Sequence, residues 1–310
     1  MTEIKTDFKA GVTTDIEPAA PLPRSVTMTP KLRLPPLACD AHCHVFGPFD
    51  RFPLPSDRSF TPPEAPEAAL RTLHDSLGLA RAVIVHSQGH GRDHRPLLDA
   101  LAEGRGRYRG VAVLTPDTAP SEIARFDAAR VCGVRFNFLA HLGGGPSAEA
   151  MRAVTALVRP FGWHIAVHVT GADLIRYADA IAAIDARVVI DHMARPDLEA
   201  ELDVCRAILF RLLDSGRVWV KLSGSDRLSE AGAPYRDVVP YARSLAEHAP
   251  ERVLWGSDWP HVNISGPMPD DAALVDLIAE IAPSTALRQR LLVDNPIELF
   301  GFGPSDDVVL

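Results

Sequence analysis

The chain has 310 residues, of which 46% are hydrophobic and 23% are charged, the balance typical of a soluble globular protein. Its formal net charge of −8 argues against nucleic acid or an anionic membrane as a partner, because both attract basic proteins. No apolar run reaches the roughly 18 residues of a membrane span, and the N-terminus lacks the apolar core of a signal peptide. We therefore expect a cytoplasmic protein whose four scattered cysteines are reduced thiols.

Residues 1–35 predict a loosely ordered N-terminal arm. They contain five prolines, mixed charges and few periodic apolar positions, so they have little apolar surface to bury. We expect this arm to lie over the body of the protein or to fray, and it could contribute to a homo-oligomer contact. Residues 303–310 form a short C-terminal tail, which leaves residues 36–302 for a folded domain.

In residues 36–302, short apolar runs bounded by turn residues alternate with amphipathic stretches. The predicted strands are residues 38–45, 80–86, 110–114, 133–138, 164–169, 188–191, 218–222 and 252–256. The predicted helices are residues 63–78, 93–104, 119–130, 147–160, 171–184, 199–215, 235–248 and 270–292. Nearly continuous apolar strands joined by helices predict a parallel sheet that is covered on both faces.

Eight such units favour an α/β fold of the closed (β/α)₈ barrel type over an open, doubly wound sheet. An open sheet that binds a dinucleotide would carry Gly-x-Gly-x-x-Gly after its first strand, and this chain does not. The one glycine cluster, Gly143–Gly145, lacks the lysine and Ser/Thr of a phosphate-binding loop, so we interpret it as a flexible connection.

Polar residues gather where the predicted strands end, and active sites of such barrels lie at the carboxyl ends of the strands. Five of the twelve histidines are at these positions, whereas ordinary surface histidines would scatter over the helices as well. The residues concerned are His42, His44, His86, Ser87, Gln88, Arg135, Asn137, His168, Asp191, His192, Lys221, Ser223 and Asp258.

His42 and His44 stand two residues apart on the first strand, so both rings should leave it on the same side, about 6 to 7 Å apart. Together with His168, His192 and Asp258 they would suit Zn²⁺ or a similar divalent ion. A bound metal would lower the pKa of its water to about 7, and Asp258 would act as ligand and general base. Without a metal, the histidines would hydrogen-bond a substrate carbonyl and Asp258 would activate water directly.

Structural roles are the alternative for several of these residues. Asp258, in Trp255-Gly-Ser-Asp-Trp-Pro-His261, could be a turn or cap residue, and His192 could be a buried strand-end histidine. His164 begins the fifth strand at the opposite end, so we expect it to be structural. His261 follows closely enough to support Asp258.

Arg135 and Arg227 are the candidate anion-binding residues. Arg135 precedes Asn137 by two positions, so both should point into the barrel, where an unpaired arginine is costly. It should therefore meet a carboxylate, from the substrate or from the protein. Arg227 follows the seventh strand, where a surface ion pair is an equally good interpretation.

The order of these motifs resembles the amidohydrolase superfamily, and within it the 2-pyrone-4,6-dicarboxylate lactonases and their lactone-acting relatives. The similar segments, in register from about Pro35 to Phe300, are residues 40–48, 133–138, 189–193, 195–197 and 254–263. The resemblance implies a distorted (β/α)₈ barrel and hydrolysis of a lactone ring in the catabolism of aromatic or sugar acids.

The resemblance also implies residue roles. In the pyrone lactonases no metal is required. The aspartate that matches Asp258 activates water, histidines that match His42, His44 and His192 bind the carbonyl, and arginines that match Arg135 and Arg227 hold substrate carboxylates.

Two positions depart from that pattern. His141 stands where the lactonases have a second arginine on the fourth strand, which weakens the dicarboxylate clamp. His168 replaces a tyrosine and restores the histidine that metal-binding members of the superfamily use. We therefore expect one bound Zn²⁺ on His42, His44, His168 and Asp258, with metal-free catalysis as the alternative.

The sequence thus predicts a hydrolase that opens a small anionic lactone, such as a pyrone, a muconolactone or a sugar-acid lactone. Asp258 and His192 would be catalytic. Lactone isomerisation and metal-dependent decarboxylation are the alternatives. The expected substrate-binding residues are Arg135, Asn137, His86, Ser87, Arg227, His141 and His261.

Overall fold

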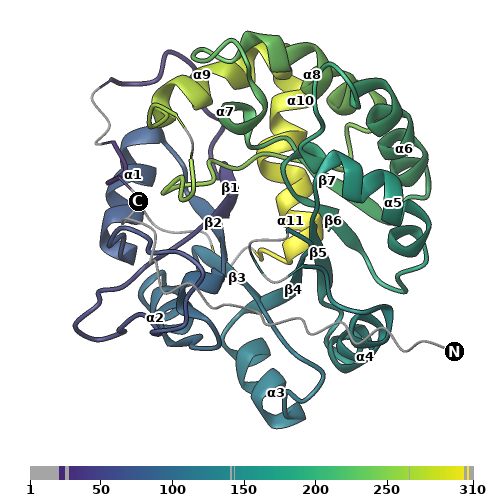
Figure 1. Ribbon diagram of the computed structural model, residues 1–310. Helices are drawn as coiled ribbons and strands as arrows, with labels where there is room; N and C mark the ends of the chain where they lie inside the picture. Colours follow the sequence, from purple (N-terminus) through teal and green to yellow (C-terminus); the bar gives the residue numbers. More distant parts are fainter. Residues whose placement is uncertain are drawn as a thin grey trace, which may run out of the picture.

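The computed structural model describes residues 21–24, 28–139, 142, 144–264, 266–303 and 306. Eight strands pair in parallel and in sequence order, and Figure 1 shows them arranged as a ring. The strands are β1 (Cys39–Cys43), β2 (Arg81–Val85), β3 (Tyr108–Ala112), β4 (Val131–Asn137), β5 (His164–His168), β6 (Val188–Ile190), β7 (Val218–Lys221) and β8 (Val253–Leu254). All eight predicted strands and the barrel architecture are confirmed.

The ring closes between β1 and the segment that follows β8. Because β8 has only two residues, three backbone hydrogen bonds beyond it complete the seam. The amides of Ala41 and His44 donate to the carbonyls of Trp255 and Trp259, and the amide of Asp258 donates to the carbonyl of His42, each at 2.8 Å. The seam therefore fixes Asp258 beside the first strand.

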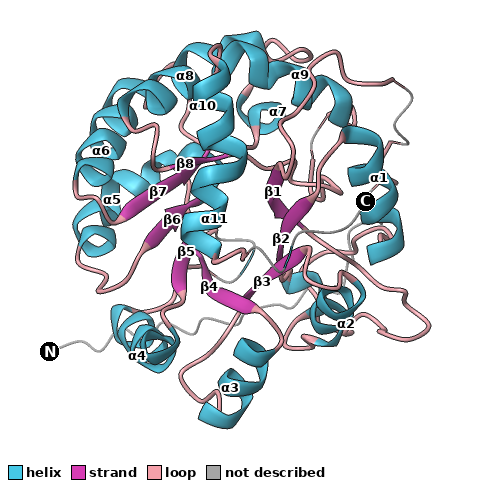
Figure 2. Ribbon diagram, turned by 180° about the vertical axis from the view of Figure 1, so that it is seen from behind, coloured by secondary structure: helices cyan, strands magenta, loops and turns pink. Residues whose placement is uncertain are grey.

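Helices surround the ring of strands, as Figure 2 shows from the other side. Those that match the predicted stretches are α1 (Glu67–Leu77), α2 (Arg95–Glu103), α3 (Pro120–Ala128), α4 (Ala148–Val158), α5 (Gly171–Ala182), α6 (Leu202–Asp214), α8 (Val239–His248) and α9 (Asp271–Ile281). Each places an apolar stripe on the sheet; α1, for example, buries Leu70, Leu73 and Leu77.

The predicted helix over residues 270–292 is wrong in its second half. Helix α9 ends at Ile281, because Pro283 cannot continue it. The chain then forms α10 (Thr285–Gln289), a π-helical turn (Arg290–Asp294) and α11 (Asn295–Phe300). The pattern also did not predict α7 (Ser225–Leu228), a single turn after β7 that is too short for a periodic signal.

The amino-terminal end of the barrel is filled by apolar side chains. Leu299 and Phe300 of α11, with Phe302, pack against interior residues such as Val83 and Val189, and α11 lies within the outline of the ring in Figures 1 and 2. This packing leaves the opposite end of the barrel for polar groups.

The termini lie largely outside the described residues. The predicted arm is described only at residues 21–24 and 28–35, and the predicted tail only at residues 303 and 306. In the described part of the chain, no helix has the length and hydropathy needed to cross a membrane.

His164 has the structural position expected for it. Its side chain begins β5 at the filled end, is fully buried, and packs edge-on against the ring of Phe300 at a centroid distance of 5.3 Å. Burial lowers the pKa of His164 to about 3. The folded protein therefore keeps this ring neutral at pH values at which the unfolded chain protonates it.

This pKa predicts an acid-dependent effect of the His164→Phe substitution. An imidazole whose pKa falls on folding costs stability as the pH drops below its unfolded value, near 6.5. Between pH 7.5 and pH 5, the free energy of unfolding of the variant should rise by about 2 kcal/mol relative to wild type. Urea unfolding at both pH values measures this difference. A difference that does not change with pH would contradict the assignment, whatever constant offset the phenylalanine introduces.

Candidate active site

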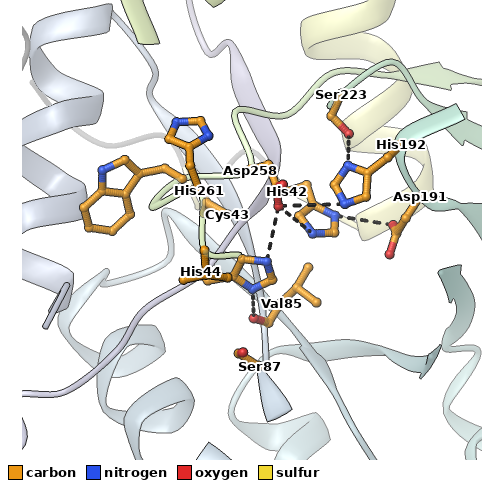
Figure 3. A network of polar contacts seen from close by, with 12 residues as sticks. His42, Cys43, His44, Val85, Ser87, Asp191, His192, Ser223, Asp258 and His261 are labelled. Carbon is orange, nitrogen blue, oxygen red and sulfur yellow. Dashed lines mark hydrogen bonds and ion pairs between the residues drawn. The ribbon is translucent and has the colours of Figure 1, made fainter. Parts of the chain in front are cut away.

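Asp258 lies at the centre of the polar end of the barrel, with three imidazoles around one of its oxygens (Figure 3). Its Oδ1 lies 3.4 Å from His44 Nε2, 3.6 Å from His42 Nε2 and 3.8 Å from His192 Nε2. Asp258 is only 3% exposed, so these are contacts in a nearly dry environment. The structure thus brings together four residues that the sequence placed on three different segments.

The carboxylate of Asp258 is held ionised by its neighbours. Burial alone would raise its pKa, but the Arg227 guanidinium and the ring of His192 hold the pKa of Asp258 well below its usual range. Arg227 Nε donates to Asp258 Oδ2 at 2.5 Å, and Arg227 also donates to the carbonyl of Val262. Arg227, expected to bind an anion or to form a surface pair, therefore forms a buried ion pair with Asp258.

His44 is fixed in one orientation and one tautomer. Its Nδ1 lies 2.7 Å from the carbonyl oxygen of Val85. A carbonyl oxygen only accepts, so Nδ1 carries a hydrogen and Nε2 is the nitrogen that faces Asp258. With a single ring hydrogen, Nε2 and Asp258 Oδ1 are two acceptors 3.4 Å apart, which favours a bound group that contacts and satisfies both.

His192 reaches the site through an unusual backbone. His192, Met193, Ala194 and Arg195 are four consecutive residues with left-handed φ angles of 51°, 54°, 61° and 46°. Such strained conformations persist only where the surroundings over-determine them, and they gather at functional sites. Here Tyr241 donates to the carbonyl of Met193, and His192 Nδ1 pairs with Ser223 Oγ at 2.9 Å.

Behind His42 lies a buried charge cluster. Asp191 Oδ2 accepts from Arg135 Nε at 2.8 Å, and Asp191 Oδ1 lies 3.1 Å from Lys221 Nζ. Burial would raise the pKa of Asp191, but Lys221, His42 and Arg135 hold it well below its usual range. The carboxylate that the sequence predicted for Arg135 is therefore one of the protein's own.

His42 itself is fully buried and neutral. Its Nδ1 lies 2.9 Å from Lys221 Nζ and 3.3 Å from Asp191 Oδ1. Burial, and then the nearby ammonium of Lys221, lower the pKa of His42 to about 3. Its Nε2 has no hydrogen-bond partner among the described residues.

A cavity of about 100 Å³ opens beside these groups. Of the predicted residues, Ser87, Asn137, His168 and the two arginines discussed above line it together with His44, His192 and Asp258. His168 Nδ1 pairs with Asn137 Oδ1 at 3.1 Å, and its Nε2 has no partner in the described part of the chain.

Two of the predicted substrate-binding residues, His86 and His261, do not line this cavity. His86 Nε2 donates to the carbonyl of Gly91 and the ring stacks on His94, while His261 Nε2 pairs with the buried Asp271 at 3.0 Å. His261 supports the site indirectly, since its amide donates to the carbonyl of Asp258. His141 lies outside the described residues.

Arg195 lines the cavity and was missed from the sequence. Its side chain has no hydrogen bond or ion pair with any described residue, although Arg195 lies within the resembling segment 195–197. A half-buried guanidinium beside a cavity favours an anionic ligand. Its position depends on the left-handed backbone run, which no periodicity in the sequence signals.

Two groups of side chains at the site could hold a metal ion. Among the described residues, His42, His44 and Asp258 offer ligand atoms within 4.8 Å of one another, and so do His42, Asp191 and His192. Zinc bonds of about 2.0–2.2 Å in tetrahedral geometry separate ligand atoms by about 3.3–3.6 Å. The 3.4 and 3.6 Å separations around Asp258 fit this value. His168 belongs to neither group.

Asp40, beneath the site, is a second residue that the sequence did not reveal. Its Oδ1 accepts from the amides of His42 and Ser257 at 3.0 Å. Its Oδ2 accepts from Ser257 Oγ at 2.5 Å and lies 3.2 Å from His74 Nε2. Asp40 thereby ties the strand of His42 to the turn of Asp258.

The chain is similar to known proteins over most of its length. A family model for amidohydrolases matches residues 39–302. The 2-pyrone-4,6-dicarboxylate hydrolase of Comamonas testosteroni is 41% identical over 281 residues, 87% of this chain and 92% of that protein. The 4-sulfomuconolactone hydrolase of Rhizobium radiobacter is 38% identical over 283 residues, 90% of this chain and 95% of that protein. A crystal structure from Agrobacterium tumefaciens aligns with a TM-score of 0.80 at 31% identity, over 89% of this chain and 99% of the other.

Asp40→Asn should destabilise the protein. The new side-chain amide would have only one acceptor oxygen. Its NH₂ group would face groups that now donate to the carboxylate, such as the amides of His42 and Ser257, and these would lose their acceptor. We expect the free energy of unfolding to fall by about 1.5–3 kcal/mol. Urea unfolding measures it, with Asp75→Asn as the matched control, because Asp75 forms an exposed pair with Arg107. Equal effects of the two substitutions would contradict the role given to Asp40.

Proposed function

Because the chain belongs to the amidohydrolase family, we propose that it is a hydrolase that opens a small lactone bearing a carboxylate. The observation that carries this proposal is the ionised Asp258, surrounded by imidazole nitrogens and bordering a cavity that three arginines line. A buried carboxylate among neutral imidazoles suits a general base that moves a proton between water and a leaving group.

The two facing acceptors position the nucleophile. A water molecule between His44 Nε2 and Asp258 Oδ1 can donate one hydrogen to each, which relieves their repulsion and directs its lone pair to the substrate. As the water oxygen bonds to the lactone carbonyl carbon, Asp258 takes one of its two protons. The ring C–O bond then breaks, and Asp258 returns that proton to the leaving oxygen, which becomes a hydroxyl group. The second proton of the water leaves the new carboxylic acid for solvent, so that a carboxylate results.

His192 acts on the carbonyl oxygen of the lactone. The hydroxyl of Ser223 can donate to His192 Nδ1, which leaves the hydrogen of the neutral ring on Nε2, facing the site. A donor aimed at the oxygen that becomes negative stabilises the tetrahedral intermediate. The left-handed backbone that holds His192 keeps this donor in place before the reaction starts.

The arginines select the substrate. Arg195 has no ion-pair partner among the described residues, and Arg135 uses only its Nε on Asp191, so its terminal nitrogens remain for an anion. The cavity of about 100 Å³ limits the substrate to a single small ring with its substituents. A pyrone, a muconolactone or a sugar-acid lactone meets both conditions.

The distances among the same ligand atoms would suit a divalent ion such as zinc. His42 Nε2, His44 Nε2 and Asp258 Oδ1 would hold it, and His44 would keep its hydrogen bond to Val85, as metal-binding histidines do. Such an ion would polarise the lactone carbonyl and lower the pKa of its bound water to about 7. His168 remains a predicted ligand, and metal-free catalysis by Asp258 remains the alternative; elemental analysis of protein purified without chelator distinguishes the two.

Asp258→Asn should abolish turnover of the lactone. The amide cannot accept the proton of the attacking water, and loss of a general base typically lowers kcat by about 10² to 10⁴. Initial rates with pyrone, muconolactone and sugar-acid lactones measure this, with circular dichroism as the check on folding. A rate close to wild type in a folded variant would exclude Asp258 as the base.

Product analysis in H₂¹⁸O belongs to the same experiment. Hydrolysis places one ¹⁸O atom in the new carboxylate, isomerisation by a substrate hydroxyl places none, and decarboxylation releases CO₂. A product without ¹⁸O would overturn the hydrolase proposal while leaving Asp258 as a base.

Arg195→Gln should lower kcat/KM for a carboxylate-bearing lactone by about 10- to 100-fold, the range of a lost charge-assisted hydrogen bond. Arg236→Gln is the matched control, since Arg236 is 68% exposed and pairs with Glu280 far from the cavity. For the corresponding lactone without a carboxylate, the substitution should change kcat/KM little. Equal losses on both lactones would show that Arg195 does not bind the carboxylate.

A further inference from the structure

Lys221 is a buried residue that the proposed mechanism does not use. It ends β7, its side chain is 0% exposed, and its ammonium lies 2.9 Å from His42 Nδ1 and 3.1 Å from Asp191 Oδ1. An ammonium group has three hydrogens and no acceptor. Whatever lies within hydrogen-bond distance of it must therefore accept.

This contact decides where His42 carries its hydrogen. If Nδ1 accepts from Lys221, the neutral ring has its hydrogen on Nε2. The other tautomer would direct an Nδ1–H group at an ammonium only 2.9 Å away, and its one available acceptor would be Asp191 Oδ1 at 3.3 Å. Arg135 contacts the other oxygen of Asp191, and Lys221 Nζ is the nearer of the two groups to His42 Nδ1, so the contact with Lys221 favours the first tautomer.

We propose that Lys221 holds His42 in the Nε2–H tautomer, so that His42 is a hydrogen-bond donor at the site and a poor ligand for a metal ion. The neighbouring His44 is held in the opposite tautomer by Val85. The two histidines of one strand thus present a donor and an acceptor on either side of Asp258 (Figure 3). His42 Nε2 lacks a hydrogen-bond partner among the described residues and is fully buried 3.6 Å from Asp258 Oδ1, so it would donate to a group bound next to that oxygen.

The contact also opposes a metal at the site. A metal needs the lone pair of Nε2, so the hydrogen of His42 would have to move to Nδ1, facing Lys221. Lys221 is therefore a positioning residue that favours a substrate carbonyl over a divalent ion. Its effect on catalysis rests on the proposed lactone hydrolysis, whereas its effects on the tautomer and on metal affinity do not.

The tautomer can be read directly from a long-range ¹H–¹⁵N correlation spectrum of protein labelled with [¹⁵N]histidine and stripped of metal. Signals that disappear in His42→Gln identify His42. We expect Nε2–H in wild type and in Arg135→Gln, which removes a positive charge from Asp191 but leaves the Lys221 contact. In Lys221→Met the hydrogen should move to Nδ1. Nδ1–H in wild type would overturn the proposal, even if the variants did not fold.

Zinc affinity is the second readout, measured by competition with a chromophoric chelator. Changes in the groups that orient metal ligands typically alter affinity by about 10- to 100-fold. Lys221→Met should therefore bind zinc at least tenfold more tightly than wild type, and Arg135→Gln should not. Equal gains in zinc affinity in both variants would mean that the loss of one positive charge, and not the contact with His42, explains the change. No gain in zinc affinity in Lys221→Met would refute the proposed effect of Lys221 on metal binding. Neither measurement uses a lactone, so failure of the hydrolase proposal would be seen separately, in the product analysis.

Discussion

The structure depends on the seam at which the segment after β8 closes against β1. Three backbone hydrogen bonds complete a barrel whose last strand has only two residues. The approach is so close that a Cβ at Gly256 would lie 2.6 Å from the amide nitrogen of His42. Asp40 joins both sides of the seam through its carboxylate. Closure of the fold and placement of Asp258 beside His42 and His44 are therefore one structural event.

The site distributes charge in two layers. Asp258 and Arg227 form an ion pair beside the cavity. Asp191, Lys221 and Arg135 form a charge cluster behind His42. The imidazoles between these layers are buried and neutral, so they add hydrogen-bonding capacity without adding charge. The surplus positive charge, with Arg195, faces the cavity and matches an anionic substrate.

The sequence predicted what depends on local periodicity. The eight strands, the covering helices and the convergence of His42, His44, His192 and Asp258 follow from alternating apolar patterns and the polarity of strand ends. It could not predict which partner each charged group would take. Arg227 meets Asp258 and Arg135 meets Asp191 because of loop geometry and register between distant strands. The same is true of Arg195, which has no ion pair with any described residue, and of the packing of α11 against the end of the barrel.

The left-handed run that follows β6 carries two different site residues, His192 and Arg195, on one short turn. His192 at its start faces Asp258, and Arg195 at its end lines the cavity where a substrate anion would bind. A ligand that shifts the backbone at Arg195 would also disturb His192, because every residue from His192 to Arg195 has a left-handed φ angle. A poorly fitting substrate would then lose reactivity as well as affinity. Related lactones would accordingly differ in kcat as well as in KM, because differences in binding that arise in the transition state change the rate of the chemical step.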